Sequence, residues 1–121
     1  MRGANEYSDG LTPPLVPVAS GAAVGALLAL PTLFLALMSS GAGHGDYVAA
    51  RALFPAPMLL TLLEGSIGII SLAMAVLQFP FYGGLLGWTH ARRSYRPAAI
   101  VGSLHLVATI LCFSGALPYF S

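Results

Sequence analysis

The sequence predicts an all-α fold, a polytopic integral membrane helical bundle. Hydrophobic residues make up 57% of the 121 residues and charged residues only 7%, against about 25% in an average soluble protein. Four acids and five bases are too few to give a soluble domain of this size a charged surface. Two long uncharged stretches, residues 18–38 and 98–117, match the thickness of a bilayer. A water-soluble enzyme is therefore not expected.

The first predicted span follows a polar, proline-rich N-terminal tail, residues 1–17, which precedes a single transmembrane domain, residues 18–121. Residues 18–38 are 21 uncharged residues, or roughly 31 Å of helix at 1.5 Å per residue. Pro31 is expected to kink this helix, which membrane helices tolerate. Because the stretch is too long for a signal peptide and its start carries two acids beside Arg2, we interpret it as an anchor.

The last predicted span is residues 98–117, with Pro97 at a favourable helix-start position. Just before it, Arg92, Arg93 and Arg96 form the densest positive cluster of the chain. Under the positive-inside rule this loop belongs in the cytoplasm, which places the C-terminus outside. All five bases are arginine and alanine is abundant, as GC-rich coding produces, so we expect a bacterial cytoplasmic membrane.

The middle of the chain must contain a break, because residues 57–89 would form about 50 Å of continuous helix. A break at residues 65–68, which include two glycines, leaves Glu64 at the membrane surface. A later break would place this carboxylate inside the bilayer, at a cost of roughly 2.5–3.5 kcal/mol near the centre. The sequence therefore predicts a break at residues 65–68.

That break yields two further spans, residues 46–64 and residues 69–89, the first of them kinked by Pro55 and Pro57. The bundle is then expected to have four spans, with both termini outside. Three spans are the alternative, because both topologies place four arginines inside and one outside.

Polar residues follow helical spacing in the predicted third and fourth spans. The third span carries Ser71, Gln78 and Tyr82, and the fourth carries His105, Thr109 and Cys112. We expect the two stripes to face each other, because small and polar residues form the useful helix interfaces in lipid. In an antiparallel hairpin that turns at residues 93–94, Tyr82 is expected beside His105 or Leu106. Gln78 is then expected beside Thr109 or Ile110.

His105 lies inside the predicted fourth span, and an intramembrane ionisable group is a functional hypothesis by default. Over one turn, this span resembles the pigment-binding helix of bacterial light-harvesting polypeptides, in which an alanine precedes the histidine by four residues. Here Val101 takes that place. The resemblance implies chlorophyll on His105, and a neutral imidazole also suits a haem iron. We expect no cofactor and no metal, and instead a neutral His105 bonded to Tyr82 or to a backbone carbonyl.

Small residues recur every four positions in two of the predicted spans. Gly21, Gly25 and Ala29 form one such motif, and Gly83 and Gly87 form another. These motifs let helix backbones approach closely, within a chain or between proteins. Because the Gly21 stripe has no polar complement on its helix, we expect it to be the outer docking face for a partner, with Gly83 and Gly87 next.

The functional expectation is a small non-enzymatic accessory subunit, since no Ser/His/Asp or Cys/His catalytic set and no metal-ligand spacing can be assembled. It would contact the lipid bilayer and the subunits of a larger complex, such as a respiratory or photosynthetic one. A net charge of +1 argues against nucleic acid. One alternative is a small transporter or ion carrier, acting as a homo-oligomer, with a polar path through Gln78, Tyr82, His105 and Thr109. A second alternative is a carrier of haem or chlorophyll on His105.

Overall fold

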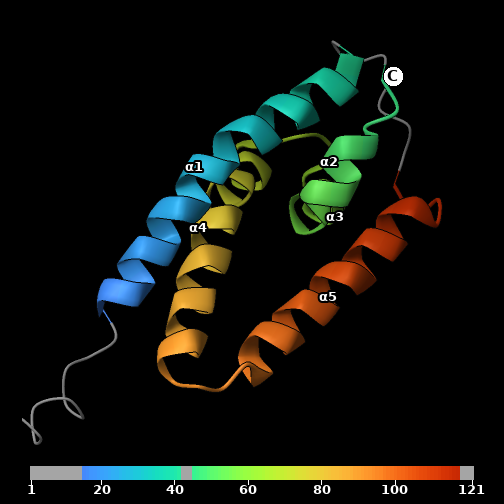
Figure 1. The fold of residues 1–121 in the computed structure, drawn as a ribbon. Coiled ribbons are helices and arrows are strands. Elements are labelled where there is room, and N and C mark those ends of the chain that lie inside the picture. Colours follow the sequence, from blue (N-terminus) through green and yellow to red (C-terminus); the bar gives the residue numbers. More distant parts are fainter. Residues whose placement is uncertain (1–14, 42–44, 118–121) are drawn as a thin grey trace, which may run out of the picture.

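The structure is a computed structural model that describes residues 15–41 and 45–117. Within these residues the chain forms five α-helices and no strand, which confirms the predicted all-α class. The helices, drawn in Figure 1, are α1 (Leu15–Ser40), α2 (Val48–Leu53), α3 (Pro55–Glu64), α4 (Ile69–Ala91) and α5 (Arg96–Phe113).

Three helices, α1, α4 and α5, are long and apolar enough to cross a membrane. They coincide to within a few residues with the predicted first, third and fourth spans. Large apolar side chains cover their outer surfaces, and Ile69, for example, is 83% exposed. Outward-facing apolar side chains are compatible with lipid, where there is no hydrophobic penalty for exposure. The described residues are thus compatible with a membrane helical bundle.

The predicted second span, residues 46–64, is divided into two short helices, so the count of four spans is not confirmed. Helix α2 has 6 residues and α3 has 10, or roughly 9 Å and 15 Å of helix, and neither reaches across a hydrocarbon core of about 30 Å. The break falls at Phe54, whose φ of −128° and ψ of 52° are not helical. The cause is Pro55, because a residue that precedes proline is disfavoured in the helical region.

Helices α1 and α4 form an antiparallel pair in direct backbone contact (Figure 1). Gly21 lies against the backbone of Gly83, and Gly25 lies against the backbone of Phe79. A Cβ atom at Gly21 would overlap the carbonyl oxygen of Gly83. The absence of side chains at these positions therefore sets the separation of the two helices.

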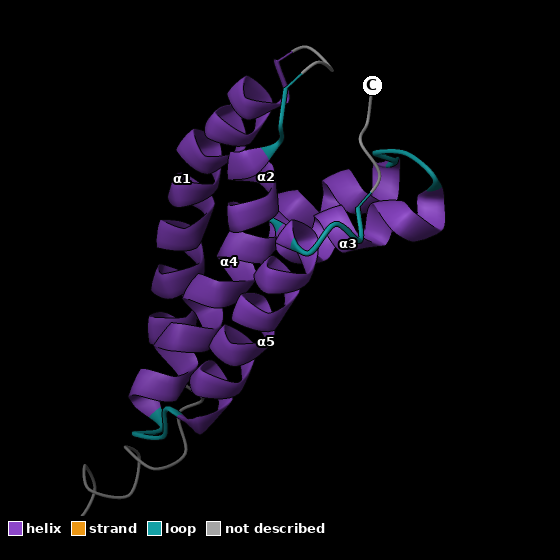
Figure 2. Cartoon of the chain, turned by 90° about the vertical axis from the view of Figure 1, so that its right-hand side faces the viewer, coloured by secondary structure: helices purple, strands orange, loops and turns teal. Residues whose placement is uncertain are grey.

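Helices α4 and α5 are joined by a tight turn in which Arg93 adopts a positive φ of 51°. From this turn the two helices diverge, and α2 and α3 occupy the opening between their far ends (Figure 1). Seen from the side, α2 lies alongside α1, whereas α3 points away from α1 at an angle (Figure 2). The buried cluster lies at this open end, where Tyr47, Ala50, Met58, Cys112 and Leu117 pack together.

The α2–α3 pair begins and ends at the same end of the bundle. The N–H of Tyr47 donates to the carbonyl of Ser39 near the end of α1, at 3.2 Å. Ile67, in the loop that follows α3, lines the same 170 Å³ hollow as Ser40 and Tyr47. The chain therefore enters α2 and leaves α3 close to the C-terminal end of α1, while the α4–α5 turn lies at the opposite end.

Candidate functional site

The break between α2 and α3 leaves backbone carbonyls without helical partners in the interior of the bundle. The last turn of any helix has unpaired carbonyls, and Pro57 has no N–H to offer the carbonyl of Leu53, four residues earlier. In a bilayer each unsatisfied backbone group costs several kcal/mol. Side chains from neighbouring helices must therefore supply the missing donors.

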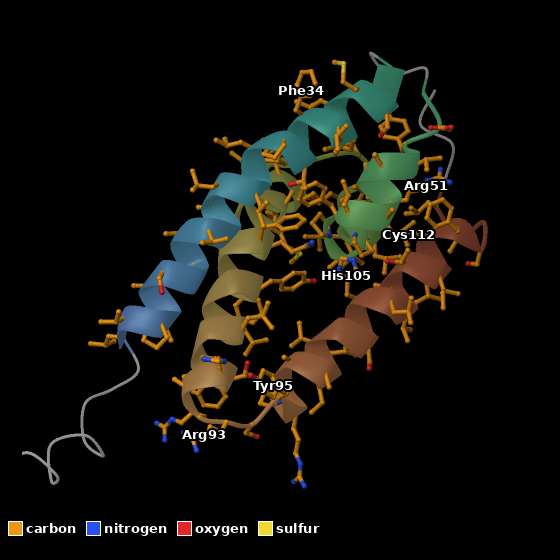
Figure 3. The ribbon with its side chains drawn as sticks, in the orientation of Figure 1. Phe34, Arg51, Arg93, Tyr95, His105 and Cys112 are labelled. Atoms are coloured by element: carbon orange, nitrogen blue, oxygen red, sulfur yellow. The ribbon has the colours of Figure 1, made fainter. Side chains whose placement is uncertain are left out.

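Three side chains of α4 and α5 bond to backbone carbonyls beside the break. Gln78 Nε2 of α4 donates to the carbonyl of Leu53 at 2.7 Å. His105 Nε2 of α5 lies 3.2 Å from the carbonyl of Ala52, and Cys112 Sγ donates to the carbonyl of Pro55 at 3.4 Å. Figure 3 shows His105 and Cys112 pointing from α5 toward the α2–α3 pair. Three members of the predicted polar stripes thus hold the broken helix in place.

Tyr82 and His105 meet across the α4–α5 opening, as the hairpin register predicts. The Tyr82 hydroxyl lies 2.9 Å from His105 Nδ1, and the two rings are edge to face at 5.6 Å. Because a carbonyl can only accept, His105 Nε2 must carry a hydrogen to donate to Ala52. In the neutral ring Nδ1 is then the acceptor, and Tyr82 donates to it.

Both ring nitrogens of His105 are engaged by these two bonds. An axial bond to a haem iron or a chlorophyll magnesium would have to replace one of them. In the described part of the chain, no group of three or more His, Cys, Asp or Glu side chains is placed to hold a metal ion.

The Gln78 amide bonds to Leu53 rather than to Thr109 or Ile110, the residues beside which it was expected. Thr109 Oγ1 donates to the carbonyl of His105 in its own helix, at 2.9 Å. Gln78 Oε1 is buried and has no hydrogen-bond partner among the described residues.

Ser71, the first member of the α4 stripe, bonds to Glu64 at the end of α3 rather than to α5. Glu64 Oε2 accepts from the Ser71 hydroxyl and, at 3.1 Å, from the backbone N–H of Ser71. The backbone N–H of Ile70 donates to Glu64 Oε1 at 3.3 Å. These bonds, that of the Ser71 hydroxyl above all, lower the pKa of Glu64. The predicted break at residues 65–68 is present, and it lets Glu64 cap the N-terminus of α4.

The expected outer docking face at Gly21 faces α4 instead. Gly21 and Gly25 contact the backbone of α4, and Gly83 and Gly87 contact the backbone of α1. Gly25 and Ala29 are buried. Each motif packs against the other. Because both are used in one intramolecular interface, the Gly21 motif is not available as an outer docking face.

The arginine-containing turn between α4 and α5 carries two aromatic contacts. The Arg92 guanidinium lies over the Trp88 ring, 5.9 Å from its centroid, and His90 Nδ1 lies 3.0 Å from the Tyr95 hydroxyl. Figure 3 shows Arg93 projecting outward from this end of the molecule and Tyr95 beside the turn. Aromatic rings beside arginines are typical of a membrane–water interface.

Two cavities flank the Tyr82–His105 pair, and sequence analysis gave no sign of either. One has a volume of 380 Å³ and extends along α4 and α5 toward the arginine turn, past Leu86 and Gly102. The other has a volume of 470 Å³ and is lined by Met74, Gln78 and Leu104 among others. The signal that could have found them is the pair of prolines after Phe54, because a broken helix between α4 and α5 prevents these helices from closing.

The fold and site together define a helical bundle compatible with a membrane, in which a broken helix is held by polar side chains from two long helices. No protein family, curated protein or solved structure matches the chain.

Proposed function

We propose that this protein is a small non-enzymatic accessory subunit that packs laterally against a larger membrane protein complex. The observation that carries the proposal is that polar side chains inside the bundle bond to other groups of the bundle itself. Gln78, His105 and Cys112 bond to the carbonyls of the broken helix, and Ser71 bonds to Glu64. What is left for interactions is an apolar lateral surface, which suits association within the membrane.

Helix α5 is the part of the bundle that best fits a partner. Cys112 is the buried residue among its 18 residues, whereas α1 and α4 pack backbone to backbone. On its outer side a shallow 330 Å³ hollow contains Ser103 and Val107. A small residue in such a hollow allows a neighbouring helix to approach closely.

Isolation of the intact assembly tests this proposal. Purification in mild detergent is expected to give a complex of fixed stoichiometry and of greater mass than one chain, measured by native mass spectrometry. Ser103→Trp should dissociate the complex by steric overlap, whereas Ser20→Trp, at an exposed position on α1, should not. A monomer in every mild detergent would contradict the accessory role. A complex that is unaffected by Ser103→Trp would contradict the proposed docking side.

For the topology we propose three spans, α1, α4 and α5, with the α2–α3 pair entering and leaving the membrane at one face. With Arg92, Arg93 and Arg96 in the cytoplasm, the start of α1 lies at the cytoplasmic face and the loop before α2 at the outer face. This arrangement corresponds to the three-span alternative rather than to the expected four spans. A bacterial cytoplasmic membrane remains the expected location.

Cysteine labelling distinguishes the two topologies. In a Cys112→Ala background, a cysteine at Asp46 and a cysteine at Ser94 should react with impermeant reagent from opposite faces if there are three spans. Four spans would place both positions at the cytoplasmic face. Labelling from the same face would therefore refute the proposed topology.

A second candidate function, a small transporter or ion carrier, is favoured by the helix break itself. In many transporters interrupted helices mark the binding site inside the membrane. Gln78 Oε1 lies beside the break with no partner in the described part of the chain, and it is a further group that could bind a substrate. Ion or solute flux into liposomes that contain only this protein, lost in Gln78→Leu, would support this candidate. Its absence together with a stable heteromeric complex would support the accessory role.

A further inference from the structure

The 380 Å³ cavity between α4 and α5 has the size and lining of a small-molecule site. Sites for small ligands usually have volumes of about 300–1,000 Å³, apolar walls and a few polar groups. Here Phe79, Leu86 and Val101 supply apolar walls, and Tyr82 and His105 supply the polar side-chain groups. A Cβ atom at Gly102 would meet nothing within 4 Å, so this wall is open.

The hydrogen bonds of the Tyr82–His105 pair decide which polar group the cavity can accept. His105 Nε2–H donates to Ala52 and Nδ1 accepts from Tyr82, so neither nitrogen is available to a ligand. The Tyr82 O–H is also engaged, but its oxygen retains the capacity to accept a hydrogen bond. The cavity therefore offers an acceptor and no side-chain donor. A ligand with a hydroxyl can bond to it, whereas a ligand with carbonyls alone cannot.

The depth of the pair excludes ligands with charged head groups. His105 is nine residues from the start of α5, roughly 13 Å along the helix, and Tyr82 is likewise far from both ends of α4. A phospholipid head group is held at the membrane surface by the cost of burying charge. A neutral lipid-soluble molecule can place its hydroxyl at this level.

We propose that the α4–α5 cavity binds a neutral, lipid-soluble phenol, a class that includes quinols, with its hydroxyl donating to Tyr82 Oη and its ring against Phe79. The phenolic O–H supplies the donor that the cavity lacks. The aromatic ring adds to apolar burial because ring pairs attract beyond their area alone. This inference is independent of whether the protein has a partner subunit.

The experiment compares a phenol with its methyl ether, which has the same shape but no donor. Full-length protein in phosphatidylcholine nanodiscs is titrated with radiolabelled 4-decylphenol or 4-decylanisole, and binding to empty nanodiscs is subtracted. The phenol should bind roughly three- to tenfold more tightly, the usual range for one hydrogen bond. Tyr82→Phe should remove that difference. Equal affinities in the unchanged protein would overturn the proposal and indicate simple filling of the cavity by any alkyl chain.

Two leucine variants locate the binding. Gly102→Leu places a side chain in the open wall of the cavity and should weaken phenol binding by at least about tenfold, because it removes room for the ring. Ser20→Leu adds a similar side chain at an exposed position on α1, away from the cavity, and should leave binding unchanged. Neither position has neighbouring atoms that force unfolding, since Gly102 has open space and Ser20 is exposed. Unchanged binding in Gly102→Leu would refute the site.

Discussion

Gly83→Ala should separate α1 from α4, and the structure allows the effect to be estimated. The added Cβ would overlap the carbonyl oxygen of Gly21, and the obstacle is backbone rather than a side chain that can rotate. Overpacking of this kind costs about 1–3 kcal/mol. Alanine also favours a helix over glycine by about 1 kcal/mol, which offsets part of the cost. We therefore expect a net loss of up to roughly 2 kcal/mol in the free energy of unfolding.

Gly102→Ala is the matched control, because it makes the same chemical change in α5 where a Cβ meets nothing within 4 Å. It should raise stability by up to about 1 kcal/mol through helix propensity alone. Reversible unfolding in mixed micelles, followed by circular dichroism, measures both variants under one set of conditions. If Gly83→Ala stabilises the protein as much as Gly102→Ala does, α1 and α4 are not in backbone contact and the proposed packing is wrong.

Further predictions concern the polar groups. Gln78→Leu should lower the free energy of unfolding by about 1 kcal/mol, because it removes the donor to the carbonyl of Leu53, and increased hydrogen exchange in α3 should accompany it. His105→Leu should cost about 1 kcal/mol in the same assay and leave the absorption spectrum unchanged; loss of a visible band would instead indicate a cofactor on His105. The lowered pKa of Glu64 means that its stabilising effect is complete above its ordinary value of 4.5 and is lost as the pH falls through the lowered pKa. Protection of the first turn of α4 should decrease over that acid range, whereas Glu64→Gln should show no such change; an identical pH profile in both would refute the cap.

The sequence alone determined the all-helical class and the positions of the three long helices. An uncharged stretch of about 20 residues has few alternatives to a helix of membrane length, because in lipid the backbone must satisfy its own hydrogen bonds. The contact of Tyr82 with His105 was also predictable, since α4 and α5 are joined by a short turn that fixes their register. The break before Ile69 followed from the two glycines and from the cost of burying Glu64.

Only the tertiary structure decided whether residues 46–64 form one kinked span or two short helices. Pro55 and Pro57 each lack a backbone N–H, and this is equally true of a kinked span and of a broken helix. The outcome depends on whether donors from elsewhere reach the freed carbonyls. Gln78 and His105, which are distant in the sequence from Leu53 and Ala52, supply them, and this makes a full break tolerable.

The tertiary structure also decided which way the glycine motifs face. Four-residue spacing places Gly21 and Gly25 on one side of a helix, but it is equally compatible with a partner protein and with another helix of the same chain. Gly83 and Gly87 present the matching backbone, and they meet the first motif only when α4 returns antiparallel to α1. Local spacing defines a face, whereas its partner depends on contacts between residues about 60 positions apart, which no local pattern encodes.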